Sequence, residues 1–164
     1  ANALYTGRAD SGVLNAAQLL KAHKEGYREL LDLSTLDIPY QHLGLAVNSK
    51  LVQTRRADVL NLLRAFSETM FTMRRDPAGT KQVLAQYNKL DPQQDAELLD
   101  GIYQIVVQRQ LADLPYPKVE PVQALLDVAS TTNPAAKNFD AKKIIDDSLV
   151  RELDQSGLFK TLEK

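Results

Sequence analysis

The apolar residues of this 164-residue chain change their spacing near residue 50. Before that point, short runs of small and apolar residues surround one helical segment, whereas the later residues repeat with the three-to-four spacing of amphipathic helices. The early runs predict three short strands, at residues 9–14, 27–33 and 43–48. Two or three short strands cannot form an independent parallel sheet with both faces covered. The pattern therefore predicts an α/β fold, mostly helical here, whose remaining strands lie elsewhere.

The first two expected strands enclose a helix from residue 16 to about residue 25, which makes a right-handed βαβ unit. Asn15 is expected to cap the start of this helix, and Gly26 to close it. Residues 1–6 resemble the last turn of a helix that Gly7 ends. A chain that begins inside a helix end is expected to be the C-terminal part of a larger α/β protein.

The remaining sequence predicts helices over residues 57–75, 78–90, 92–110, 120–129 and from 147 or 148 to Gly157, with short turns at 49–53 and 140–145. Gly101 lies inside one helix, where it costs about 1 kcal/mol relative to Ala, so close packing is expected there. The inward positions share i, i+3, i+4 spacing. They are Val59, Leu62, Leu63, Phe66, Met70 and Met73; Val83, Leu84 and Tyr87; and Leu98, Leu99, Ile102, Ile105 and Val106.

Composition excludes several classes of function. Lys and Arg total 20 against 21 Asp and Glu, and no basic cluster occurs, so nucleic-acid binding is not expected. Without cysteine there is no disulfide, thiolate metal site or cysteine nucleophile, and two histidines, His23 and His42, do not make a metal site. No apolar run approaches the roughly 18 residues that span a bilayer, and no signal segment opens the chain. No catalytic residue, metal or cofactor is expected.

Several segments, in collinear order, resemble the bacterial substrate-binding proteins of ABC-type importers for nitrate, sulfonate, taurine and thiamine precursors. Residues 7–17 (GRADSGVLNAA) resemble the segment in which a strand follows a G-x-x-D motif, and residues 32–40 (DLSTLDIPY) look like the loop that leaves the second lobe. Three later segments resemble the C-terminal signature of this family. They are residues 116–123 (YPKVEPVQ), 138–140 (NFD), and 145–153 (IDDSLVREL) with 156–157 (SG).

The resemblance implies a two-lobed solute receptor of type II periplasmic-binding-protein fold, in the periplasm or as an extracellular lipoprotein. Its lobes close on a small solute, an anion such as a sulfonate or nitrate or else a thiamine precursor, and it delivers the solute to an ABC permease. Residues 1–42 would end the second lobe, 43–48 would be the hinge-crossing strand, and 49–164 would flank the first lobe with helices. The chain would lack its N-terminal half, so a companion half or a dimer is an expected partner.

The candidate ligand-binding residues are Asn15, Ala16 and Ala17, at the carboxyl end of a strand and the start of a helix, where backbone N–H groups hold anions. A plain N-cap role for Asn15 is an equal alternative. Tyr40 and His42 lie beside the expected hinge and are further candidates, although a packed loop Tyr is favoured over a ligand contact. The resemblance places the hinge at Gly44, Leu45, Ala46 and Val47.

The other polar residues have structural interpretations. His23 is expected to be a satisfied structural histidine, and Met70 and Met73 are expected in the core. Two arginine pairs are expected to be solvated helix ends or to dock onto the permease, and the adjacent acids near residue 147 to cap a helix rather than bind a metal. These pairs are Arg55–Arg56, Arg74–Arg75 and Asp146–Asp147.

Three other functions remain open alongside a solute-binding component. A sensor or regulatory domain of the same fold would pass lobe closure to an attached module. A helical interaction domain with a hairpin-like edge would have no small-molecule ligand, although its exposed strand edges argue against it. An enzyme is disfavoured, because the fungal pyrimidine-synthase branch of the superfamily carries a Cys-rich motif and this chain has no cysteine.

Overall fold

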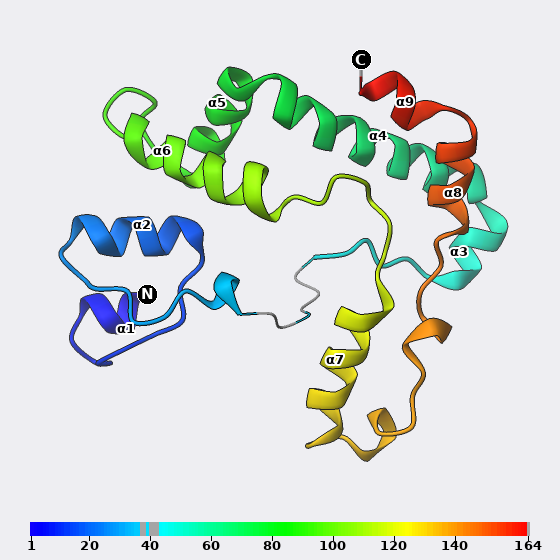
Figure 1. The fold of residues 1–164 in the computed structure, drawn as a ribbon, viewed down its shortest axis with the longest axis horizontal. Coiled ribbons are helices and arrows are strands. Elements are labelled where there is room, and N and C mark those ends of the chain that lie inside the picture. Colours follow the sequence, from blue (N-terminus) through cyan, green and yellow to red (C-terminus); the bar gives the residue numbers. More distant parts are fainter. Residues whose placement is uncertain (37–38, 40–42, 164) are drawn as a thin grey trace. The chain divides into compact units, whose positions relative to one another are not determined.

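The computed structural model describes residues 1–36, 39 and 43–163, and Figure 1 follows the chain through them. Helices make up 63% of the structure, and no strand occurs in the described residues. The expected α/β class with about three strands, and with it the type II periplasmic-binding-protein fold, is therefore wrong for this chain, which is all-helical.

The three segments expected to be strands are non-helical over most of their length, and none of them forms a strand. A strand buries its apolar side chains only beside another strand, and within the described residues none of the three has such a neighbour. Their apolar side chains are consequently exposed: Val13 by 84%, Leu30 by 77% and Leu43 by 79%. The second segment ends in a short 3-10 helix, η1 (Leu33–Thr35), instead of continuing extended.

The chain divides into two compact units, which are described separately. Unit 1 consists of Ala1–Leu33 and Met70–Ala112, and unit 2 of Ser34–Thr69 and Asp113–Lys164. Helix α4 (Arg56–Arg75) begins in unit 2 and ends in unit 1. The division into lobes expected from the family resemblance stays a prediction.

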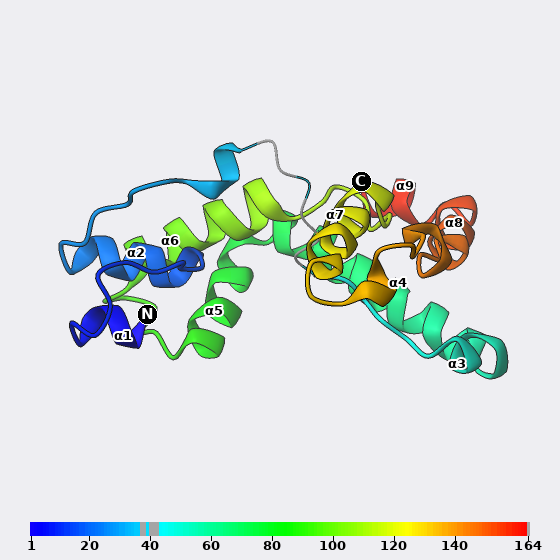
Figure 2. The same cartoon turned by 90° about the horizontal axis from the view of Figure 1, so that it is seen from below.

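Unit 1 is built around α6 (Ala96–Tyr103), which packs against α2 (Ala16–Lys24) and α5 (Pro77–Asn88) (Figure 2). The caps at the ends of α2 are as predicted, because Asn15 accepts the Gln18 N–H and Gly26 has a φ of +85°. The short α1 (Asn2–Tyr5) is fastened to this helix by the Tyr5 hydroxyl, which donates to the Gln18 carbonyl at 3.2 Å.

Gly101 makes the close contact that its position inside a helix predicts. A Cβ at this position would lie 2.8 Å from Leu20 Cδ1, so the absence of a side chain lets α6 approach α2. Helix α6 starts later than expected: Asp91 first accepts the N–H groups of Gln93 and Gln94, both at 2.8 Å, in a turn that precedes the helix.

The carboxyl end of α6 departs from the predicted register. Residues Gln104–Gln110 form a π-helix, η2, in which the Leu111 N–H donates to the Val106 carbonyl at 3.0 Å. Val107, which is completely buried, takes the place in the core that the sequence predicts for Val106. Val106 and Ile105 are only half-buried.

Helix α4 buries part of its predicted stripe, whereas α5 leaves most of its predicted stripe exposed. On α4, Val59 and Met70 are buried as predicted, but Leu62 and Phe66 are 48% and 56% exposed. Ser67 and Phe71 are buried instead. Ser67 leaves no unpaired polar atom in the core, because its hydroxyl donates to the Leu63 carbonyl at 2.8 Å. On α5, Val83 and Tyr87 are 64% and 86% exposed.

Unit 2 contains the start of α4, α3 (Ser49–Thr54), α7 (Val119–Ser130), η3 (Pro134–Ala136), η4 (Ala141–Lys143), α8 (Ser148–Gln155) and α9 (Leu158–Leu162). Gly157, with a φ of +80°, ends α8 as predicted. The chain then forms α9, a helix that the sequence pattern does not predict. The core is formed by Ala141, Leu149, Val150, Leu153 and Phe159 together with Val59.

Two of the phenylalanines of unit 2 test this assignment of the core. Phe159 is 2% exposed, so we expect Phe159→Ala to lower the free energy of unfolding by about 3–5 kcal/mol in urea denaturation. Phe66→Ala is the matched control and should lower it by about 0.5 kcal/mol or less. Equal losses from the two variants would contradict the buried face described for α4.

The contact between Gly101 and Leu20 gives a second test. Ala in place of Gly inside a helix stabilises by about 1 kcal/mol, but here the Leu20 side chain has to rotate away. We expect Gly101→Ala to gain stability in a Leu20→Ala background and to gain distinctly less in the wild-type background. A double-mutant cycle measured by urea denaturation checks this, and identical gains in both backgrounds would rule out the contact.

Candidate functional site

The predicted ligand-binding residues lie at the start of α2. The Gln18 N–H donates to Asn15 Oδ1 at 3.0 Å, and the Asn15 N–H donates to Gln18 Oε1 at 3.2 Å, which completes a capping box. The N-cap alternative for Asn15 is therefore confirmed. Ala16 and Ala17 are half-buried, and their N–H groups belong to the first turn, which has no acceptor within the helix. A ligand role for these three residues stays a prediction.

The remaining predicted site residues do not come together in the described structure. Tyr40 and His42 lie outside the described residues. Gly44, Leu45 and Val47, like Ala46 between them, are exposed in the extended segment 43–48, which leads into α3. The hinge role of this segment stays a prediction.

The charged residues of the sequence analysis are mostly paired. His23, which is exposed rather than packed in a core, has its Nε2 3.6 Å from Glu29 Oε2, an ion pair when the imidazole is protonated. Arg55 pairs with Asp58 at 2.5 Å, and Arg56 with Glu152 at 2.7 Å.

Arg74 is not the solvated helix end that the sequence predicts. Its Nη2 donates to the carbonyls of Leu111 and Ala112, at 2.8 and 2.9 Å. These carbonyls follow the last residue of η2, where a helix leaves acceptors without partners. No feature of the local sequence indicates this contact, because the residues are 37 and 38 positions apart.

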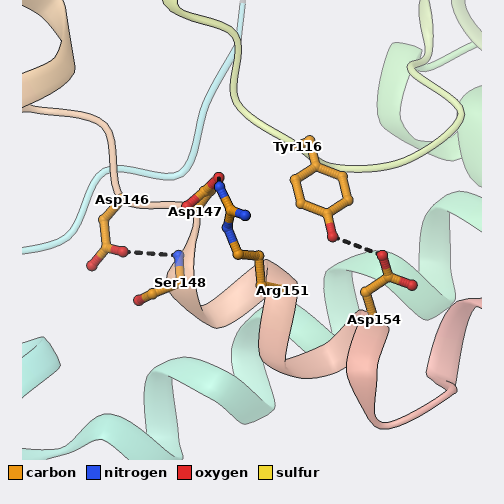
Figure 3. Close-up of polar contacts among 6 residues, drawn as sticks. All are labelled: Tyr116, Asp146, Asp147, Ser148, Arg151 and Asp154. Carbon is orange, nitrogen blue, oxygen red and sulfur yellow. Dashed lines mark hydrogen bonds and ion pairs between the residues drawn. The ribbon is translucent and has the colours of Figure 1, made fainter.

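Polar side chains in or next to the segments compared with the family's C-terminal signature lie around α8 in unit 2, and Figure 3 shows their polar contacts. We call this set the α8 cluster: Tyr116, Asp146, Asp147, Ser148, Arg151 and Asp154. The Tyr116 hydroxyl donates to Asp154 Oδ2 at 2.7 Å, which fastens the extended segment before α7 to the second turn of α8. Arg151 Nη2 donates to Asp147 Oδ2 at 2.6 Å, and the Ser148 N–H donates to Asp146 Oδ1 at 2.9 Å.

These contacts shift the pKa values of the cluster. The Ser148 hydroxyl and N–H lower the pKa of Asp146, with help from the charge of Arg56, and Arg151 lowers the pKa of Asp147. Because the lowered pKa of Asp146 belongs to the folded state, its stabilisation is complete above the ordinary value of 3.8. It is lost as the pH falls through the lowered pKa. The hydrogen bond to Asp154 raises the pKa of Tyr116.

The carboxylates of the α8 cluster are held in place by hydrogen bonds. Asp146, Asp147 and Asp154 each accept one from the protein. No group of three or more potential metal ligands occurs among the described residues. A second contact between separate segments joins α7 to η4, since the Ala141 N–H donates to Gln123 Oε1 at 3.3 Å.

Unit 1 contains two surface grooves, and neither is lined by a predicted ligand residue. One, of about 180 Å³, lies between α5 and α6, where Lys81 Nζ pairs with Asp100 Oδ1 at 2.6 Å. The other, of about 240 Å³, lies between α2 and α6. It is lined by Leu20, His23, Lys24, Glu97 and Leu98.

The bond between Tyr116 and Asp154 predicts a change in tyrosine titration. Because the Asp154 carboxylate accepts a hydrogen bond from the phenol, the neutral form of Tyr116 is favoured in the folded state. The resulting stabilisation is present below pH 10.0 and is lost as the pH rises through the raised pKa of Tyr116. We expect Asp154→Asn to lower the pKa of Tyr116. The difference in tyrosinate absorbance between each protein and its Tyr116→Phe variant measures this pKa.

Tyr87→Phe controls for the loss of one phenol, because the Tyr87 side chain is 86% exposed. If the difference titration assigned to Tyr116 did not move on Asp154→Asn, the hydrogen bond would not exist in solution.

Comparison with known proteins adds no relative. No helix in the described part of the chain is long and apolar enough to cross a membrane. No family model matches the sequence, and neither a curated protein nor a solved structure matches it.

Proposed function

We propose that this chain is part of the solute-binding component of an ABC-type importer and acts without catalysis. The solute is small and anionic, such as a sulfonate or nitrate, or is a thiamine precursor, and the protein works in the periplasm or as an extracellular lipoprotein. The observation that supports the proposal is the α8 cluster. Tyr116 and Gln123, which belong to one segment that resembles the family's C-terminal signature, bond to Asp154 and Ala141, each of which directly follows another such segment in the sequence.

The start of α2 supplies the part of the chain that suits an anion. The N–H groups of Ala16 and Ala17 point out of the first turn, and the helix dipole adds partial positive charge there. The neutral side chain of Asn15 is held in place, because its amide oxygen caps the helix. A site of this kind recognises charge and size through the backbone, which fits a receptor that binds a solute without changing it.

The exposed apolar segments require a partner in this proposal. Val13 and Leu30 in unit 1, and Leu43 in unit 2, lie in extended segments whose side chains face solvent. Apolar area of this kind is costly to leave in water, at about 25 cal/mol per Å². A companion half or a second copy of the chain would cover it and complete the receptor, and an ABC permease would receive the solute.

A native mass spectrum of the purified protein, followed by thermal unfolding with a panel of sulfonates, nitrate and thiamine precursors, tests the proposal. A retained solute or a companion polypeptide supports it, and a bound solute at a hundredfold excess over its Kd should add about 2.7 kcal/mol of stability. A bare monomer of 18.3 kDa that no solute stabilises would contradict it.

Variants of Asn15 locate the site. Asn15→Asp keeps a good N-cap but puts a negative charge beside the proposed anion, so we expect the solute-dependent rise in Tm to disappear. Asn15→Ser, a neutral cap of similar quality, is the matched control and should keep the rise. Loss in both variants, or in neither, would mean that the start of α2 does not hold the solute.

A second candidate is a helical interaction module with no small-molecule ligand, and the all-helical fold favours it. Such a module would use its exposed apolar side chains to bind a protein partner. The same measurements separate the two functions, because the interaction module would show a companion polypeptide in the mass spectrum but no response to any solute.

A further inference from the structure

The π-helix η2 is an unusual element, and its own backbone hydrogen bonds do not explain why it forms in place of an α-helix. Most π-helical hydrogen bonds in proteins occur as single turns inserted into α-helices, and they cluster at functional positions. Here the π-helix extends over the 7 residues Gln104–Gln110 and follows α6 without a break. Since the α-helix is the common form, other contacts must select the π form in this segment.

The buried side chains show where the register changes. Leu98, Leu99, Ile102 and Tyr103 are buried with α-helical spacing, which would next bring Val106 into the core. The structure instead buries Val107 completely and leaves Val106 half-buried. Because the two residues are both valine, either register supplies the core of unit 1 with the same side chain. Exchanging Val107 for Val106 in the core therefore costs no packing energy from a change of side chain.

Polar contacts hold the π form. Gln108 Nε2 donates to the Tyr103 hydroxyl at 3.0 Å, a pairing of residues five positions apart that a π-helix brings onto one face and an α-helix does not. The Tyr103 hydroxyl donates in turn to the Met73 carbonyl at 3.2 Å. Both ends of this chain of hydrogen bonds lie in unit 1.

Arg74 binds the point at which the π-helix ends. Its Nη2 reaches the carbonyls of Leu111 and Ala112 together, and this requires the chain to leave the helix in one particular direction. A change of register would rotate that exit and move both carbonyls away from the guanidinium. The planar, always charged guanidinium is well suited to holding two acceptors in a fixed geometry.

We propose that Gln104–Gln110 is a register switch between a π-helical and an α-helical form, with Arg74 as the latch that holds the π form. In the π form Val107 is in the core and the Leu111 N–H bonds to Val106. In the α form Val106 replaces Val107, the Leu111 N–H bonds to the Val107 carbonyl, and the exit at residues 111–112 turns to a new direction. The switch thus controls how the chain leaves unit 1.

The acceptor of the Leu111 N–H reports the register directly, and scalar coupling across the hydrogen bond in NMR of the full chain identifies it. In the wild type we expect coupling to the Val106 carbonyl. In Arg74→Gln this coupling should weaken or be lost, and coupling to the Val107 carbonyl should appear. Arg75→Gln is the matched control, because Arg75 is exposed at the next position of α4, and it should keep the wild-type acceptor.

A second pair of variants forces each register from the core side. A glutamine is disfavoured in the core, so Val107→Gln should drive the segment to the α form and Val106→Gln should keep the π form. If Val107→Gln fails to fold, the arginine pair still decides the question. The switch is overturned if Arg74→Gln keeps Val106 as the only acceptor of Leu111 and merely loses stability, since the π-helix would then have a single register.

Discussion

A helix satisfies its backbone hydrogen bonds within its own segment, whereas an extended segment needs a neighbour, and this difference governs the whole structure. The described chain contains three apolar extended segments and offers none of them a neighbouring strand, so they form no sheet, and side chains such as Val13 and Leu43 are exposed. The helices fold around their own cores in two units. The described architecture is all-helical because the helices alone satisfy their backbone within their own segments.

Within unit 1, a shift of one residue determines which side chains reach the core. The α6 backbone passes into a π-helix, and Val107 takes the place that α-helical spacing assigns to Val106. On α4, Val59 and Met70 are buried as the apolar pattern predicts, but Ser67 is buried in place of Phe66, with its hydroxyl satisfied by the Leu63 carbonyl. In both helices, hydrogen bonds that are invisible in an apolar pattern accompany the change in buried residues. Polar satisfaction therefore ranks with apolar periodicity in setting the register of these helices.

The features that the sequence predicted correctly are local. Asn15, Gly26 and Gly157 act at helix ends because a cap depends on only a few neighbouring residues, and Gly101 is where a close contact occurs. The prediction of three strands was wrong because strand pairing depends on distant segments. The predicted buried faces of α4, α5 and α6 were each wrong in part. At the start of α8, Asp147 is the N-cap residue as predicted, but its side chain does not cap, and Asp146 accepts the Ser148 N–H instead. The bonds Arg56–Glu152 and Tyr116–Asp154 could not be predicted from local sequence, because their partners are 96 and 38 residues apart.

The hydrogen bonds of the α8 cluster show what its charged groups do in the folded chain. The carboxylates of the cluster accept hydrogen bonds from protein donors, and their contacts favour the charged form of Asp146 and Asp147 and the neutral form of Tyr116. The bonds of Asp146 and Asp147 are local to the start of α8, whereas the bond between Tyr116 and Asp154 joins residues 38 positions apart. The cluster therefore combines contacts that hold the start of one helix with one contact that links this helix to the segment before α7, and only the loss of that one contact would separate the two segments.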